Sequence, residues 1–194
     1  MEFLLGMTGK DFTLTISDTA ATRSIIVFKN DEDKSLELNK HVLMLYSGSP
    51  GDTLHFAEYI QRNVKLYEIK NGIELTPKAT ATFTRREMAT SLRSRKPYNV
   101  NLLIAGYDVT TSLPHLYWID HLGTNATMPY AAHGYGAFYT LGILDKYHRP
   151  DISLDEAKAI AKKCIEELKT RFFINLSGFK VKVSDKDGIR EIEI

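Results

Sequence analysis

The chain has 194 residues, about the size of one domain, and 43% of them are hydrophobic, which is enough to build a large buried core. Its 25 lysines and arginines balance 24 acidic residues, so a protein that binds nucleic acid through a basic excess is excluded. The single cysteine, Cys164, cannot form an internal disulfide and excludes a secreted disulfide framework. We expect one soluble intracellular domain, residues 1–194.

The N-terminal segment, residues 1–7, has an early acid, no basic region and too short an apolar run for a signal peptide. No stretch approaches the roughly 20 apolar residues that a membrane span needs. The six histidines form no HExxH motif, and the chain has no CxxC motif. We therefore predict no membrane association, no metal and no cofactor.

The first quarter of the chain predicts strands. Phe12, Leu14 and Ile16 alternate with threonines, the period of a strand with one buried face. Residues 42–46 form a continuous apolar run, which is more typical of a strand covered on both faces.

Two helices are expected next. Ser49 is the predicted N-cap of the first helix, and Gly72 its stop. Thr76 caps the second, which Pro97 ends, and the basic run of residues 93–96 lies at that helix end, where cations favour the dipole. The apolar residues at helical spacing on the first helix are Phe56, Ile60, Val64 and Tyr67.

The same order is then repeated. Strands are predicted at residues 100–107 and 116–119, followed by a helix that ends at Tyr147 and a helix that starts with a capping box at residues 153–156. Alternation then predicts strands at 179–183 and at 192–194, separated by a turn. Strands with two helical pairs between them indicate a layered α+β domain without internal repeats.

Isolated residues do not define a site by spacing alone. His133 is better explained as a turn histidine than as a catalytic one, and Gly134-Tyr135-Gly136 lacks the third glycine of a dinucleotide fingerprint. Cys164 lies on the apolar face of its helix, which favours a core residue over a nucleophile.

Ordered strings along the whole chain carry a more specific signal. They are Gly51-Asp52-Thr53, Phe56-Ala57-Glu58-Tyr59-Ile60-Gln61, Arg93-Ser94-Arg95-Lys96-Pro97-Tyr98, Ala105-Gly106-Tyr107-Asp108, Ala131-Ala132-His133-Gly134-Tyr135-Gly136 and Asp185-Lys186-Asp187-Gly188-Ile189. Together they resemble the eukaryotic proteasome beta subunits, most of all the occupant of the fourth position of the beta ring. The resemblance implies a four-layer αββα sandwich of the N-terminal-nucleophile hydrolase type.

The resemblance also places the family's active site on this chain. Active members attack the peptide carbonyl with an N-terminal threonine, helped by its own amine and a nearby lysine. Aligning Ile16-Ser17-Asp18 with the family motif puts Asp18 on the site aspartate, Lys34 on the site lysine and Gly48 on the glycine whose amide serves the oxyanion. Glu2 then holds the nucleophile position, where its carboxylate is a weak nucleophile that would give an anhydride. We expect no catalytic residue.

Later site positions also depart from the family pattern. Tyr135 replaces the serine of a Gly-Ser-Gly turn, as a bulky group at a close-packed turn, and Phe172 and Asn175 fall on the late aspartate and serine. Asp18 and Lys34 are then expected to remain as a structural ion pair, because removing one member of a buried pair leaves an uncompensated charge.

The implied function is that of a non-catalytic structural beta subunit of the 20S proteasome core, acting in assembly and in the wall of the chamber for ubiquitin-dependent degradation. The implied partners are the third- and fifth-position beta subunits, the alpha ring, the opposite beta ring and assembly chaperones, in the cytoplasm and nucleus. Two alternatives remain. One is an active hydrolase whose nucleophile is exposed by processing, and the other is a free-standing α/β binding module.

Overall fold

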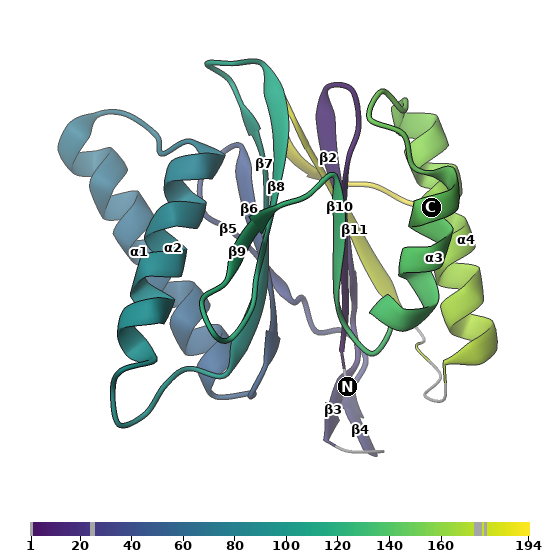
Figure 1. The fold of residues 1–194 in the computed structure, drawn as a ribbon, viewed down its shortest axis with the longest axis horizontal. Helices are drawn as coiled ribbons and strands as arrows, with labels where there is room; N and C mark the ends of the chain where they lie inside the picture. The colour runs from purple at the N-terminus through teal and green to yellow at the C-terminus, as the bar shows by residue number, and fades with distance from the viewer. Residues whose placement is uncertain (1, 24–25, 173–175, 177) are drawn as a thin grey trace.

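The structure is a computed structural model that describes residues 2–23, 26–172, 176 and 178–194. Helices form its two outer layers and strands form two facing inner sheets, as Figure 1 shows. In chain order the elements are β1 (Phe3–Thr8), β2 (Phe12–Asp18), β3 (Ala21–Arg23), β4 (Ile26–Lys29), β5 (Ser35–Glu37), β6 (Val42–Gly48), α1 (Asp52–Asn71), α2 (Pro77–Ser91), β7 (Val100–Asp108), β8 (Leu113–Ile119), β9 (Asn125–Thr127), β10 (Tyr130–Gly134), α3 (Ala137–Tyr147), α4 (Leu154–Arg171), β11 (Phe179–Asp185) and β12 (Gly188–Glu191).

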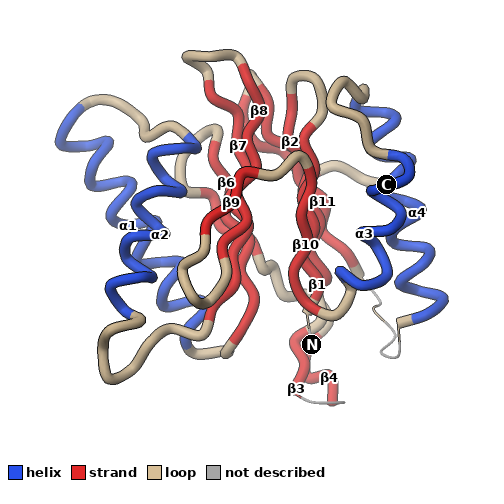
Figure 2. The backbone as a smooth tube through the Cα atoms, viewed as in Figure 1, coloured by secondary structure: helices blue, strands red, loops and turns tan. Residues whose placement is uncertain are grey.

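The described strands form two five-stranded sheets and a separate two-stranded ribbon. The first sheet has the order β10-β1-β2-β11-β12 and is covered by α3 and α4. The second has the order β5-β6-β7-β8-β9 and is covered by α1 and α2. The ribbon, β3 and β4, extends from the sandwich at the end where the N-terminus lies (Figure 2). The predicted α+β class and αββα layering are confirmed.

The period of the strands distributes apolar residues among three interior layers. In β1, Phe3, Leu5 and Met7 pack toward α3 and α4, whereas Leu4 points into the layer between the two sheets. Alternate side chains of a strand point to opposite faces, so one strand contributes to two layers.

The prediction that β2 has one buried face is wrong, because all seven of its residues are buried. Its apolar side chains face the helices, and its threonines face the second sheet. The Thr15 hydroxyl donates to the carbonyl of Lys182 in the neighbouring strand β11 over 3.2 Å. In a four-layer sandwich an inner strand is covered on both sides. Alternating polar residues therefore do not indicate a solvent-exposed face.

The predicted cap of α1 is also wrong. Ser49 directly follows β6, and its N–H donates to the Asn99 carbonyl. The helix begins at Asp52, and its N-cap is Gly51. The predicted stop is confirmed: Gly72 is left-handed, with φ 70°, and its N–H donates to the Glu68 carbonyl.

The second helix begins as predicted, since the Thr76 side chain accepts from the Ala79 N–H and Pro77 occupies the first turn. It ends at Ser91, earlier than predicted, because bonds to the third preceding carbonyl tighten the chain at Arg93 and Ser94. The basic residues 93–96 therefore follow the helix instead of forming its last turn.

In the C-terminal part, the capping box of α4 is confirmed in both directions between Ser153 and Glu156. Cys164 is fully buried on the predicted apolar face of α4. The last strand is Gly188–Glu191, earlier than the strand predicted at 192–194, because it forms a hairpin with β11.

Candidate functional site

Four polar positions from both sheets meet at one end of the sandwich. Glu2 directly precedes β1, and Asp18 ends β2, so both come from the first sheet. Lys34 directly precedes β5, and Gly48 ends β6, so both come from the second. This is the end where the N-terminus and the ribbon lie in Figure 2. The structure thus brings together the four residues that the sequence aligns with the family site, which we call the polar cluster.

Asp18 is the centre of the polar cluster and is completely buried. Its Oδ1 accepts the Phe3 N–H over 2.7 Å, and its Oδ2 accepts the Ala20 N–H over 3.1 Å and the Lys34 Nζ over 2.7 Å. Lys34 is 2% exposed and also donates to the Ala20 carbonyl over 2.8 Å. The predicted ion pair is present, and these hydrogen bonds satisfy both buried charges within the chain.

Glu2 lies on the more open side of the polar cluster. Its Oε2 accepts the Gly48 N–H over 2.7 Å, and its Oε1 lies 3.9 Å from Lys34 Nζ. Burial raises the pKa of the Glu2 carboxyl above its ordinary value, although Lys34 and the Gly48 N–H act in the opposite direction. The residue that the sequence aligns with the family's nucleophile is therefore a carboxylate that accepts a hydrogen bond within the chain.

Gly48 has to be a glycine for a local reason. Its φ is 139°, which L-residues rarely adopt, and a Cβ there would collide with the Asn99 carbonyl oxygen. This backbone conformation directs the Gly48 N–H toward Glu2.

The turn that was predicted to be crowded by Tyr135 has a different arrangement. The Tyr135 side chain is 58% exposed. The close approach belongs to the flanking glycines, since a Cβ at Gly134 would collide with the Glu2 carbonyl oxygen and one at Gly136 with the Phe3 ring. The predicted steric role of Tyr135 is therefore wrong, because the side chain leaves the turn toward solvent while the backbone approaches β1.

A cavity of about 550 Å³ lies beside Glu2 and Lys34. Apart from Glu2 and Lys34, the residues of its wall were not predicted from the sequence, although most come from the segment between Asp18 and Lys34 or from the start of α1. Their positions between aligned site residues were the available signal. Among them are Thr22, Phe28, Glu32, Tyr46 and Thr53.

The remaining predicted positions lie away from the polar cluster or outside the described residues. Phe172 is the C-cap of α4, is buried, and packs edge-to-face on Tyr139 with ring centroids 5.9 Å apart. Asn175 lies outside the described residues. Thr8, the threonine nearest to the N-terminus, donates to the Pro129 carbonyl at the opposite end of β1.

His133 lies between the two sheets. Its Nε2 is 3.0 Å from the Leu102 carbonyl oxygen, and its ring stacks on Trp118 with centroids 4.9 Å apart. Burial lowers the pKa of His133 to about 4, so the ring is neutral at physiological pH. These contacts give His133 a packing role.

Clusters of metal-ligating side chains and membrane-spanning helices are both absent from the described part of the chain. Its residues contain no group of three or more histidine, cysteine, aspartate and glutamate side chains that could hold a metal ion. None of its helices is long and apolar enough to cross a membrane.

Comparison with known proteins agrees with this geometry. The family model described as "Proteasome subunit" matches residues 3–184. A probable proteasome subunit beta type-4 from Schizosaccharomyces pombe is 54% identical over 194 residues, which is 100% of both chains. The proteasome subunit beta type-4 of Saccharomyces cerevisiae is 46% identical and covers 100% of this chain and 98% of its own.

Relatives from plants are named proteasome subunit beta type-2. The proteasome subunit beta type-2 of Oryza sativa subsp. japonica is 45% identical over 98% of this chain and 89% of its own length. The sequence resemblance favoured beta type-2 in particular. The comparisons support it under both names, type-4 in fungi and type-2 in plants.

Proposed function

The chain belongs to the proteasome subunit family, and from this premise we propose that it is a non-catalytic beta subunit of the 20S core, with its role in assembly and in the chamber wall. The observation that carries the proposal is the Glu2 carboxylate on the Gly48 N–H, at the position where an active member has its nucleophile.

The chemistry of Glu2 supports the absence of catalysis. An N-terminal nucleophile needs a hydroxyl or thiol together with the free amine of the same residue. A carboxylate that attacked a peptide would form an anhydride, a poor intermediate for hydrolysis. The Lys34 ammonium, which would tune an active nucleophile, is held by Asp18 and the Ala20 carbonyl and faces the Glu2 carboxylate, which has no hydroxyl or thiol for it to tune.

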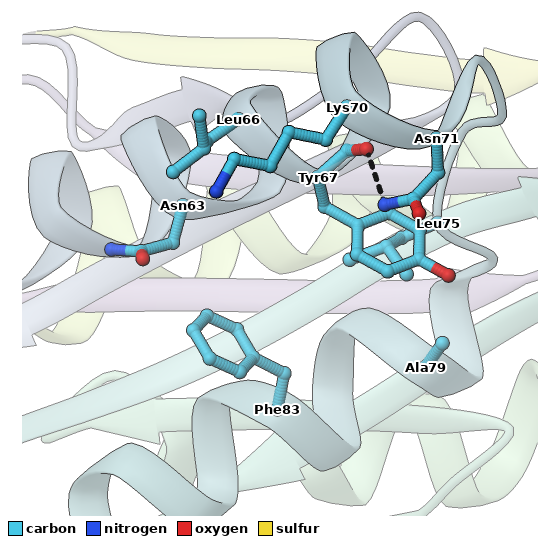
Figure 3. Close-up of a pocket in the computed structure, with 8 residues that line it drawn as sticks. All are labelled: Asn63, Leu66, Tyr67, Lys70, Asn71, Leu75, Ala79 and Phe83. Carbon is cyan, nitrogen blue, oxygen red and sulfur yellow. Dashed lines mark hydrogen bonds between the residues drawn. The ribbon is translucent and has the colours of Figure 1, made fainter.

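A role in assembly is supported by an apolar groove of about 350 Å³ between α1 and α2. Figure 3 shows Tyr67 of α1 and Phe83 of α2 lining it, with Asn71 bonded to the Tyr67 carbonyl at one end. The two helices that form the groove belong to the outer layer that covers the second sheet (Figure 1). We assign it to the alpha ring. Its lining residues are Asn63, Leu66, Tyr67, Lys70, Asn71, Leu75, Ala79 and Phe83.

Two other surfaces support contacts within the beta rings. The ribbon exposes Ile26, Val27 and Phe28, of which Phe28 is 69% exposed. At the start of α3, Phe138 is 84% exposed beside Tyr135. Exposed apolar groups that gather in this way are typical of association sites. We assign the ribbon to a ring neighbour, at the third or fifth position, and α3 to the opposite beta ring.

The same proposal extends to the cell. A ring member with these surfaces would need assembly chaperones before incorporation, and it would act in ubiquitin-dependent degradation in the cytoplasm and nucleus. Native mass spectrometry of particles purified from each compartment would test this, and absence of the chain from them would contradict it.

A labelling experiment tests the lack of catalysis. Assembled particles are saturated with a peptide epoxyketone, which needs the hydroxyl and the amine of one N-terminal residue. We expect adducts on the active subunits, which serve as the internal positive control, and none on this chain. An adduct here would establish an active nucleophile and overturn the proposal.

The assembly role is tested by native mass. Alone at working concentration, a free binding module would stay near its 22.0 kDa. We expect the chain to be recovered in a particle with other proteasome subunits. Recovery as a stable monomer from cells would contradict the proposal.

A further inference from the structure

The Gly48 N–H lies at a break in the hydrogen-bond ladder of β6. On the side toward β5, the Tyr46 N–H donates to the Lys34 carbonyl over 3.0 Å. N–H groups two residues apart in a strand point the same way, so the next donor on that side is Gly48. The acceptor it finds is the Glu2 carboxylate, 2.7 Å away. A side chain from the first sheet thus replaces a missing backbone acceptor in the second.

The Glu2 carboxylate is held in this position by its own backbone. The following N–H, that of Phe3, donates to buried Asp18, and the Glu2 carbonyl fits against Gly134, where a Cβ would collide with it. Because the carboxylate is attached to a fixed strand, an external acceptor must compete with a ligand at high effective concentration.

We propose that Glu2 is an internal ligand that closes the Gly48 amide and the side of Lys34 facing the cavity to peptide carbonyls and small carboxylates. The inference rests on the proposed function and adds to it. The subunit not only fails to cleave peptides but also does not hold them at this site, so it does not retain substrate or product inside the chamber.

The chemistry of the cavity fits this inference. One carboxylate oxygen on an amide N–H and the other facing an ammonium at 3.9 Å is the arrangement that a bound peptide carboxylate would adopt. Glu32 adds a second acidic side chain to the wall of the same cavity. With Glu2 shortened to alanine, the Gly48 N–H and Lys34 would face the open cavity and would attract a small carboxylate.

The test uses assembled particles whose active subunits are blocked with epoxyketone and in which only this subunit carries ¹³C-methyl alanine. Ala21 lines the cavity, so its methyl resonance reports binding there. Sodium acetate is the probe, and sodium chloride at equal ionic strength is the control. We expect the Glu2→Ala particle to bind acetate at least about tenfold more tightly than the unmodified particle, since a hydrogen bond to a charged group is lost from the closed state.

Two matched variants separate closure from a change in charge. Glu2→Gln keeps an oxygen that can accept the Gly48 N–H, and it should remain closed. Glu32→Ala removes a carboxylate from the same cavity without touching Gly48, and it should also remain closed. Equal acetate binding by the unmodified and Glu2→Ala particles would overturn the inference, and so would opening by Glu32→Ala alone.

A measurement on the unmodified particle keeps the inference testable if Glu2→Ala fails to assemble. Residue-resolved hydrogen exchange should show a protected Gly48 amide, because its N–H is bonded to Glu2, and rapid exchange would overturn the inference. Epoxyketone labelling reports catalysis and acetate binding reports closure. The two proposals can therefore fail separately.

Discussion

The polar cluster and the α1–α2 groove differ in whether their side chains find partners within the chain. In the polar cluster, the buried charges of Asp18 and Lys34 and the Gly48 N–H all find partners within the chain. In the groove, apolar side chains such as Leu66 and Tyr67 are left exposed. The comparison teaches that the polar groups of the cluster are satisfied within this chain, whereas the groove leaves apolar side chains available to a partner.

Removing one charge of the polar cluster should have the largest effect. Lys34→Met leaves the buried Asp18 carboxylate without its cation, which typically costs about 3–5 kcal/mol. We expect the variant to be lost from assembled particles, as measured by quantitative mass spectrometry of its peptides. Lys180→Met, which removes a more exposed partner of Asp33, is the control and should assemble normally. Normal assembly of Lys34→Met would show that the pair is dispensable.

A smaller effect is expected from protonating His133, a buried group between the sheets. Its folded pKa is about 4 and its ordinary value is 6.5, so the unfolded state binds the proton more readily. Its contribution to stability is present above pH 6.5 and is lost as the pH falls toward 4, by roughly 3 kcal/mol in all. His133→Gln removes the titration and should flatten the pH dependence of thermal unfolding between pH 7 and 4. An unchanged dependence would assign the acid sensitivity to other groups.

A charge introduced into the groove should weaken association with other subunits and leave the fold intact. Leu66 is exposed, so Leu66→Asp should leave the fold intact but place an unpaired charge in the proposed interface. A lost interface anchor typically costs about 1–2 kcal/mol, or roughly tenfold in the incorporated fraction. Asn63→Asp, which adds the same charge to the lining without removing an apolar side chain, is the matched control. Equal incorporation of Leu66→Asp and the unmodified chain in a competition assay would show that the groove is not an interface.

The smallest effect concerns the surface of the other helical layer. Lys163 Nζ lies 3.8 Å above the Tyr147 ring and joins α4 to α3. An exposed cation–π contact is worth about 0.5–1 kcal/mol. Lys163→Met should lower the midpoint of thermal unfolding slightly, while Lys162→Met, on the same exposed helix, should not. Equal midpoints would show that this contact does not stabilise the α3–α4 layer.

Local chemistry determined which features of the fold were predictable. The Gly72 stop, the Thr76 cap and the capping box at Ser153 depend on a few adjacent residues, and all three are confirmed. Ser49 failed as a cap because its partner is Asn99, far along the chain. Tyr67, predicted on the buried face of α1, instead lines the groove, because packing against α2 determines which of its residues are covered.

The site shows the same division between local and distant contributions. Asp18, Lys34 and Gly48 were located by resemblance to a family, since no spacing in the sequence marks them. The bond between Glu2 and Gly48 was not predicted, because it joins strands of different sheets and depends on the backbone conformation at Gly48. The wall of the cavity was missed for a similar reason, since residues from three segments form it.

The position of the first two strands has a consequence for the kinetics of folding. β1 lies between β2 and β10, and β2 lies between β1 and β11. Each of these two strands therefore needs a partner strand from the C-terminal third of the chain. During synthesis the early hairpin has two unpaired edges until Tyr130–Gly134 and then Phe179–Asp185 have left the ribosome. Pairing at such sequence separations is slow, and open strand edges aggregate. The first sheet is therefore completed only after β11 has been synthesised, and the nascent chain most needs protection before that point.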